Sequence, residues 1–338
     1  MKHTCSRITR IVTGVALSAL TFGVQAGAAE KVKITVPAPS TAFASLYHAQ
    51  SAGYFAEEGL EVEIAIVPGT ASIQAVLARD AQFAVAPGTY QLMAYEKGQR
   101  LLSVASILTR NAINIVMHKD VAAAKGITEK SALSEKFRAL KGLRISGGTP
   151  GGLAEQVLIA GLMRAGIDPQ KDINIVAVGT ISTLLAALER RQVDGFAMGT
   201  PTPEGAVTRG FGVMVVDNSA GEDPDFDEFM MDVLMTTPET AKQQPILVRK
   251  MVKALVRSNA WMLDHPVEQA LPFMKPVLSG LDDSIILAGI QKVRLGIPRD
   301  GRVTERAVKL TQDFLRRVGA LKTAIPYDQL VTNEFLPR

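Results

Sequence analysis

Five Gly-Thr dipeptides recur along this chain, each after a short apolar run and before a stretch that can form a helix: Gly69-Thr70, Gly88-Thr89, Gly148-Thr149, Gly179-Thr180 and Gly199-Thr200. Glycine allows close approach of the backbone, and the threonine hydroxyl can cap a helix by accepting a bond from a free backbone N–H. Helix N-termini also present N–H groups to any ligand in front of them. Five such junctions therefore predict a cleft lined by amides and hydroxyls, which indicates binding rather than bond cleavage.

Two of these junctions belong to an internal repeat. Residues 75–89 align without gaps on residues 186–200, and Ala, Leu, Arg, Ala, Gly and Thr coincide. Upstream, residues 67–72 and 177–182 match again after a slip of one residue. Any two strand–helix–strand units share part of this pattern. The alternative is two lobes of like construction that face each other, with both sets of junctions lining the gap.

Apolar runs of strand length alternate with helical patterns over the first two thirds of the chain. The predicted strands are 31–36, 61–67, 83–86, 101–108, 113–118, 141–146, 172–178, 193–197, 210–216 and 230–236. Such alternation predicts parallel sheets and the α/β class. The remainder is predicted to be a helical C-terminal tail, with helices over 241–264, 266–277, 283–293 and 304–318.

The order of these elements predicts a discontinuous domain organisation. Residues 29–115 and 222–338 are expected to form lobe I, and residues 116–221 lobe II. The acidic stretch 217–228 contains a glycine and a proline, so it is predicted to be a connection or hinge.

The N-terminus has the features of a secretory signal peptide over residues 1–28. Lys2, Arg7 and Arg10 precede an apolar run over 11–24, and the small residues that follow permit cleavage after Ala26, Ala28 or Ala29. The mature protein is therefore expected in the periplasm. Cys5 would leave with the signal, so no disulfide, thiolate metal site or catalytic cysteine is expected.

Charge and motifs exclude several function classes. Without the signal peptide the formal net charge falls from +4 to +1, and no basic stripe with interleaved aromatics supports nucleic-acid binding. His48, His118 and His265 have no second ligand at metal-binding spacing, and no nucleophile elbow is present. We therefore expect no enzyme activity, no metal and no cofactor.

Ligand-binding residues are expected after the carboxyl ends of strands, where open α/β sheets bind ligands. The glycine-rich loop over 147–152 is the strongest local candidate, although it fits neither a P-loop nor a dinucleotide fingerprint. For each threonine the alternative is a simple helix cap, and for the loop it is a turn that packs helix on sheet. The candidates are Ser40, Thr41, Phe43, Gly69, Thr70, Ala71, Gly88, Thr89, Gly148, Thr149, Pro150, Gly151, Thr180, Gly199 and Thr200.

An ordered set of segments carries a family resemblance. It comprises Gly53-Tyr-Phe-Ala-Glu-Glu-Gly-Leu-Glu-Val62, Arg138-Ala-Leu-Lys-Gly-Leu-Arg-Ile145, and Gln192-Val-Asp-Gly195 followed by Pro201. In this order the chain resembles the nitrate/sulfonate/taurine-type substrate-binding proteins of ABC importers. The resemblance implies a two-lobed type II periplasmic-binding-protein fold with a hinge, a monomer, and a membrane permease as partner.

The chain departs from that family in two features, one that concerns a turn and one that concerns the ligand. Arg191 stands where relatives often carry glycine, so a left-handed turn is not expected there. No arginine lies in a predicted cleft loop, which disfavours a guanidinium clamp on sulfonate or nitrate.

The expected function is an exported solute-binding protein that captures an organic-anion, aromatic or heterocyclic ligand and delivers it to an ABC permease. One alternative is an enzyme on the same fold, similar to the pyrimidine synthases of thiamine biosynthesis, whose cysteine/histidine constellation the mature chain lacks. The other is a ligand-sensing domain that feeds a signalling partner.

Overall fold

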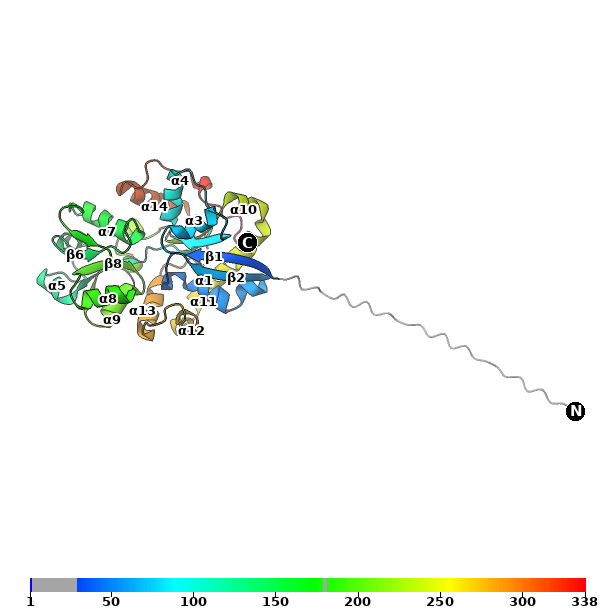
Figure 1. Cartoon of the computed structure of the whole chain (residues 1–338), viewed down its shortest axis with the longest axis horizontal. Helices are drawn as coiled ribbons and strands as arrows, with labels where there is room; N and C mark the ends of the chain where they lie inside the picture. Colours follow the sequence, from blue (N-terminus) through cyan, green and yellow to red (C-terminus); the bar gives the residue numbers. More distant parts are fainter. Residues whose placement is uncertain (2–28, 179–180) are drawn as a thin grey trace.

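Two five-stranded sheets lie side by side in the computed structural model, which describes residues 1, 29–178 and 181–338 (Figure 1). The first sheet has the order β2-β1-β3-β10-β4, and the second has the order β7-β6-β8-β5-β9. We call the first sheet with its helices lobe I and the second lobe II. The strands are β1 Glu30–Val36, β2 Leu60–Ile66, β3 Phe83–Ala86, β4 Leu102–Leu108, β5 Ile113–His118, β6 Arg144–Ser146, β7 Asn174–Val176, β8 Gly195–Gly199, β9 Gly212–Val216 and β10 Asp232–Thr236.

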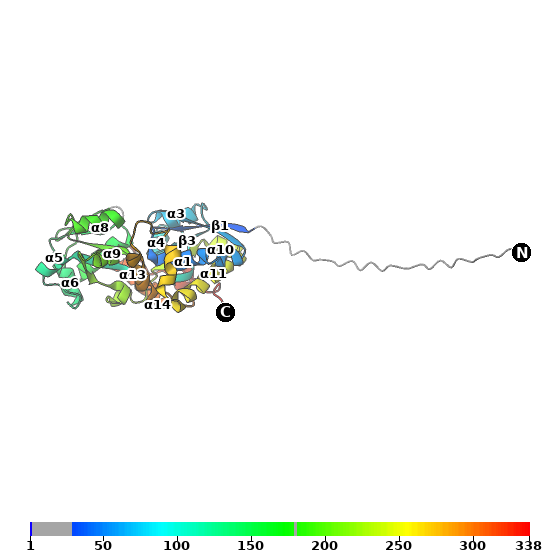
Figure 2. The same cartoon turned by 90° about the horizontal axis from the view of Figure 1, so that it is seen from below.

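The predicted α/β class is confirmed, and every predicted strand is present with its ends shifted by at most a few residues. Helices cover both sheets (Figure 2). They are α1 Ala44–Ser51, α2 Tyr54–Glu57, α3 Ala71–Leu77, α4 Gly88–Glu96, α5 Lys119–Ala124, α6 Leu133–Ala139, α7 Leu153–Arg164, α8 Ile181–Glu189, α9 Thr202–Thr208, α10 Pro238–Gln243, α11 Pro245–Asp264, α12 Leu271–Met274, α13 Asp283–Arg294 and α14 Glu305–Arg317. Short 3₁₀ turns are η1 Thr41–Phe43, η2 Asn218–Ala220, η3 Pro224–Phe226, η4 Val267–Ala270 and η5 Tyr327–Gln329.

The internal repeat corresponds to equivalent parts of the two sheets. Its first copy supplies β3 and its second supplies β8, and each is the third strand of its sheet. In both copies an arginine after the helix has a positive φ, 69° at Arg79 and 57° at Arg191. The prediction that Arg191 would not adopt a left-handed turn is therefore wrong.

Hydrogen bonds at the helix end explain that conformation. The amide of Gln192 donates to the carbonyl of Ala187 at 2.8 Å, and the amide of Asp80 donates to that of Ala75 at the same distance. A hydrogen bond from an amide to the carbonyl five residues earlier requires a residue with left-handed backbone angles between them. At both arginines the bonds that end the helix outweigh the general preference of L-residues for negative φ.

The sheets are mixed, which corrects the prediction of parallel sheets. In lobe I, β10 runs antiparallel to both β3 and β4, and in lobe II, β5 runs antiparallel to both β8 and β9. The chain passes from lobe I to lobe II over residues 109–112, the first crossover, and returns over residues 217–231, the second crossover. Because β5 and β10 each follow a crossover directly, each enters its sheet from the shared boundary and runs in the opposite direction.

The C-terminal tail is more broken than the hydrophobic pattern predicts. The predicted helix over 241–264 is divided into α10 and α11 at Gln244-Pro245, where proline has no N–H to continue the first helix. The predicted helix over 266–277 contains only η4 and α12. The predicted signal peptide falls in residues outside the described part, and the lobe boundaries remain a prediction.

In the part of the chain that the structure describes, no helix combines the length and apolar character needed to cross a membrane.

Candidate ligand site between the lobes

The loop after β1 contacts the end of β8 directly across the lobe boundary. The Ser40 hydroxyl donates to the carbonyl oxygen of Thr200 at 2.7 Å, and the Thr41 and Thr200 hydroxyls are bonded at 2.8 Å. Thr41 and Thr200 are buried. The fold therefore brings together three predicted site residues that lie 159 or 160 positions apart in the chain.

A second contact joins α4 of lobe I to α7 of lobe II. The Gln156 side-chain amide lies 3.4 Å from the Met93 sulfur, and it also donates to the carbonyl of Gly151 at 3.2 Å. Sequence reasoning missed both side chains. The available signal for Gln156 was its position in the sequence, as a polar residue among the apolar residues that form α7.

Glycine at position 88 is required by close packing between α4 and the segment before β10. Its amide donates to the carbonyl of Met230 at 2.8 Å, and a Cβ added at Gly88 would lie 2.4 Å from the Met230 Cβ. Thr89, the next residue, is fully buried, and its hydroxyl has no hydrogen-bond partner.

The helix-cap alternative is wrong for three of the threonines. The N-caps of α4, α7 and α9 are Pro87, Gly152 and Pro201, so Thr89, Thr149 and Thr200 are not capping residues. Thr70 does stand at the N-cap of α3, but its side chain makes no capping bond. Ser40 does act as a cap, of η1, because its side chain accepts from the Ala42 amide at 3.1 Å.

The glycine-rich loop after β6 is hydrogen-bonded in part to α7, the helix that follows it. Gly148 is buried with φ 73° and lies beside Met198, since an added Cβ would stand 3.3 Å from the Met198 methyl. Thr149 and Pro150 are exposed, and the Gly151 amide donates to Glu155 Oε2 at 2.5 Å. The loop therefore offers two exposed residues next to a fixed glycine.

The remaining candidates are scattered. Gly69 bonds back to the carbonyl of Pro37 at 3.3 Å, whereas Thr70 and Ala71 are exposed. Phe43 is buried in the core of lobe I. Thr180 lies outside the described residues.

Buried polar atoms without a partner concentrate at the lobe boundary. The described residues contain nine such side-chain atoms, and seven lie at the start of β10, in the crossovers, or on α4, α7 and α9, the helices that follow β3, β6 and β8. The seven belong to Thr89, Arg110, Asn111, Gln156, Glu204, Asn218 and Asp232. Because native proteins pair nearly all buried polar atoms, this concentration marks the boundary as the place where a ligand or water would supply partners.

Two carboxyl groups at the boundary have perturbed pKa values. Burial raises the pKa of Glu204 to about 7, with the charge of Asp217 adding to the effect. Glu204 accepts a bond from Asn114 at 3.3 Å, and Asn114 in turn bonds to Ser219 in the second crossover at 2.9 Å. Burial also raises the pKa of Asp232 well above its usual range.

Two cations near this boundary are already paired with acidic side chains, although the Nε atom of one of them, Arg110, has no partner. Arg110, in the first crossover, pairs with Asp227 at 3.0 Å, and Lys292 of α13 pairs with Asp217. In the described residues no group of three histidine, cysteine or acidic side chains is placed to hold a metal ion.

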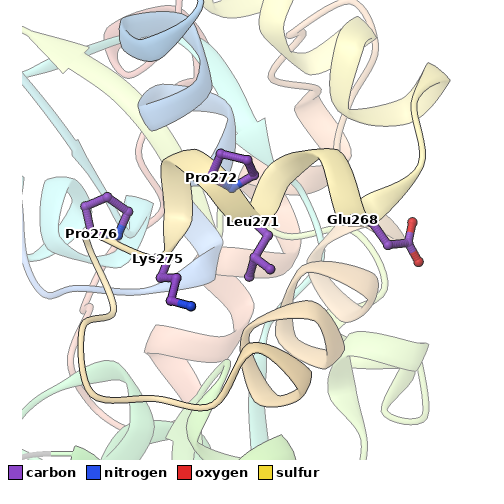
Figure 3. A pocket seen from close by; sticks show the side chains of 5 residues that line it. All are labelled: Glu268, Leu271, Pro272, Lys275 and Pro276. Carbon is purple, nitrogen blue, oxygen red and sulfur yellow. The ribbon is translucent and has the colours of Figure 1, made fainter.

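Two surface hollows lie elsewhere, on lobe I. One, of about 390 Å³, is lined by Glu268, Leu271, Pro272, Lys275 and Pro276, which all come from one short segment of the tail (Figure 3). The other, of about 350 Å³, lies between α1, β2 and the same segment. Neither hollow is lined by a residue whose buried polar atoms lack partners. We therefore place the candidate site at the boundary, where those atoms are.

The chain matches the family described as NMT1/THI5 like over residues 40–269. It belongs to this family. Curated relatives include YtlA of Bacillus subtilis, 24% identical over 311 residues that cover 90% of this chain and 88% of that protein. The riboflavin-binding protein RibY of Chloroflexus aurantiacus is 27% identical over 319 residues, which cover 88% of this chain and 84% of RibY.

Solved structures of similar fold include two periplasmic binding proteins. The alkanesulfonate-binding protein SsuA of Xanthomonas axonopodis, bound to MOPS, is 17% identical with a TM-score of 0.69, covering 89% of this chain and 98% of SsuA. The nitrate-binding protein NrtA of Synechocystis is 15% identical with a TM-score of 0.65, covering 90% of this chain and 86% of NrtA. The predicted family resemblance and the periplasmic-binding-protein fold are thus confirmed.

Gly289→Ala should disturb the contact between the lobes. Helix α13 lies at the boundary in both views (Figures 1 and 2), and a Cβ at Gly289 would stand 2.6 Å from the Pro201 Cβ and 2.9 Å from the Thr41 hydroxyl. We expect a larger radius of gyration by small-angle X-ray scattering and a loss of about 1–3 kcal/mol in stability. The control Gly161→Ala, which crowds Phe137 inside lobe II, should lose stability without expansion. An unchanged radius of gyration in Gly289→Ala would contradict this assignment.

Glu204→Gln should change how stability depends on pH. The native pKa of about 7 exceeds the ordinary value of 4.5, so the unfolded chain loses this proton first as pH rises. The wild type should therefore lose roughly 3 kcal/mol relative to Glu204→Gln between pH 4.5 and 7, with no further change above that window. Urea titrations at several pH values measure the difference. The exposed control Glu63→Gln should parallel the wild type, and a parallel curve for Glu204→Gln would refute the assignment.

Proposed function

We propose that the mature protein is exported to the periplasm, captures a small ligand between its two lobes and delivers it to the permease of an ABC importer. The observation that carries this proposal is the concentration of unpaired buried polar atoms at the boundary where the two lobes meet. The binding-protein names of its relatives support the same class of function. The basic, apolar and small-residue sequence before Glu30 supports export.

Capture would work as a shift between open and closed arrangements. Thr89 and Asp232 belong to lobe I, whereas Gln156 belongs to lobe II, so one ligand can satisfy all three only when the lobes are together. A ligand that binds the closed form more tightly shifts the population toward it. The permease would recognise the closed monomer.

The pairing of nearby cations bears on the ligand class. The relatives are named for a flavin, an alkanesulfonate and nitrate, so their names do not agree on one chemistry. A fully charged sulfonate or nitrate is best held by a free cation, but Arg110 and Lys292 are both paired. Helix N-termini can still hold a carboxylate. We therefore favour an aromatic or heterocyclic ligand, or a carboxylate attached to one.

We propose binding without catalysis. Ser258 lies 2.8 Å from the Nδ1 atom of His48, but both residues are buried among helices of lobe I, and the Ser258 hydroxyl bonds to the carbonyl of Ser45. Burial lowers the pKa of His48 to about 4, and its ring stacks on Trp261. This arrangement suits packing and not attack on a substrate.

Differential scanning fluorimetry against a panel of riboflavin, 4-aminopyrimidine, benzoate, taurine, MOPS and nitrate tests the proposal. A ligand at 100 times its Kd stabilises by about 2.7 kcal/mol, which raises the Tm by several degrees. Thr89→Val should reduce the shift given by a panel member while leaving the ligand-free Tm within about a degree, because its hydroxyl has no partner to lose.

The matched control is Thr236→Val, at the other end of the same sheet, whose hydroxyl donates to the Gln82 carbonyl at 2.8 Å. It should lower the ligand-free Tm and keep the ligand shift. A panel and a wider metabolite set without any shift would overturn the proposed function.

A further inference from the structure

Asp232 occupies the end of β10 that faces lobe II. Since β10 is antiparallel to its neighbours, its first residue lies beside the carboxyl end of β4, where it pairs with Leu108, and next to the end of β3, where Val233 pairs with Ala86. These strand ends are where an α/β sheet binds ligands. The side chain is 1% exposed.

This carboxyl group lacks the partners that Asp223, another buried carboxyl group, has. Its Oδ2 atom is buried and makes no hydrogen bond. Asp223, equally buried, accepts from the Arg164 guanidinium at 2.9 Å and from the Asp225 amide at 3.2 Å. A buried polar group without a partner costs stability, so its presence in the otherwise apolar run 229–235 needs a functional reason.

Two further polar side chains stand near Asp232. The bond between the Gly88 amide and the Met230 carbonyl fixes the start of α4 next to the start of β10. Thr89 on that helix has an unpaired buried hydroxyl. Burial, together with the nearby Asp232 charge, raises the pKa of the Tyr90 phenol to about 12. Lobe I thus presents a carboxyl, a hydroxyl and a phenol from two adjoining elements.

We propose that the Asp232 carboxyl recognises the ligand through an N–H group, so that the ligand is a nitrogen heterocycle with a hydrogen-bond donor beside an acceptor. This inference rests on the proposed function and specifies its ligand class. Sulfonate and nitrate carry acceptors only, and they would leave the acceptor oxygen of Asp232 unpaired.

The protonation of Asp232 favours a neutral ring over a simple cation. Because burial raises its pKa, the carboxyl stays protonated to a higher pH than an ordinary aspartate. A protonated carboxyl offers one O–H donor next to one carbonyl acceptor. Its complement is the N–H and neighbouring acceptor of a lactam, an imide or an aminopyrimidine.

The test compares three variants of the full mature protein by scanning fluorimetry. Asp232→Val removes the unpaired group, so it should raise the ligand-free Tm by a few degrees and abolish the ligand shift. Asp232→Asn keeps a donor and an acceptor, so it should retain part of the shift, and it provides a folded protein if valine is not tolerated. The control Asp223→Val breaks the pair with Arg164, so it should lower the ligand-free Tm without removing the shift.

Matched probe pairs isolate the N–H group. The pairs are riboflavin with 3-methylriboflavin, and 4-aminopyrimidine with 4-(dimethylamino)pyrimidine. In each pair methylation removes the donor that we assign to Asp232 and leaves the rest of the ring in place. In the pair that binds, the unmethylated member should give the same shift of the wild-type Tm at a concentration at least ten times lower than its methylated counterpart.

The outcomes separate this inference from the proposed function. If only taurine, MOPS or nitrate shifts the wild type and Asp232→Val keeps that shift, the protein binds solutes but the N–H assignment is overturned. Equal effectiveness of methylated and unmethylated probes overturns it as well. If no compound shifts any variant, the ligand-free Tm decides the role of Asp232: a decrease in both Asp232→Val and Asp232→Asn makes the carboxyl structural, whereas an increase supports a group kept for recognition.

Discussion

The arrangement of the two lobes depends on ion pairs made by the second crossover. Its acidic side chains bond to basic residues from both sides of the boundary: Asp225 pairs with Arg164 of lobe II at 2.8 Å and with Arg317 of lobe I. Asp217 pairs with Lys292 of α13, and Glu222 pairs with the buried Lys136 of α6. The segment predicted to be the hinge is therefore held at several points, and the proposed opening would have to bend the chain between these anchors.

The unpaired groups lie close to these anchors. The first crossover contributes Asn111, whose side-chain amide nitrogen has no partner, and the second contributes Asn218, whose side-chain oxygen has none. Between them, Glu204 bonds to Asn114, which also holds Ser219. Polar groups that are only partly satisfied have more than one arrangement of similar energy. The side chains at this boundary could therefore exchange hydrogen-bond partners if a ligand bound as proposed. The strands of the two sheets, whose backbones are hydrogen-bonded to their neighbours, could not.

The sequence predicts the strands of this fold well because their apolar runs are short and separated by glycine. The repeat at 75–89 and 186–200 also predicts that two equivalent strands occur, and they are the third strand of each sheet. The direction of β5 and β10 could not be predicted, because it depends on which lobe the preceding chain leaves. The division of the predicted helix 241–264 had a local signal in Pro245, which the regular hydrophobic spacing outweighed.

The candidate site is predicted less completely, for a physical reason. Gly-Thr dipeptides mark where strands end, so they include Thr200, which bonds to Thr41, and the buried Thr89. They do not report which hydroxyl finds a partner, since that depends on contacts between segments more than 100 residues apart. Gln156 lies within a helix and Asp232 begins a strand, so a search confined to loops overlooks both.

A search for site residues should also consider a single polar residue within an apolar run of a predicted strand or helix. Core strands tolerate a carboxyl group poorly, because its transfer from water to the protein interior costs several kcal/mol unless a partner replaces the lost hydrogen bonds. Where the fold supplies that partner, as Arg164 does for Asp223, the residue is explained by the structure alone. Where it does not, as for Asp232 at the lobe boundary, the cost is retained, and in the proposed binding mode the ligand would recover it. Such a residue lowers the stability of the empty form and increases the free-energy difference between the empty and filled forms, and in the proposed function that difference would drive closure.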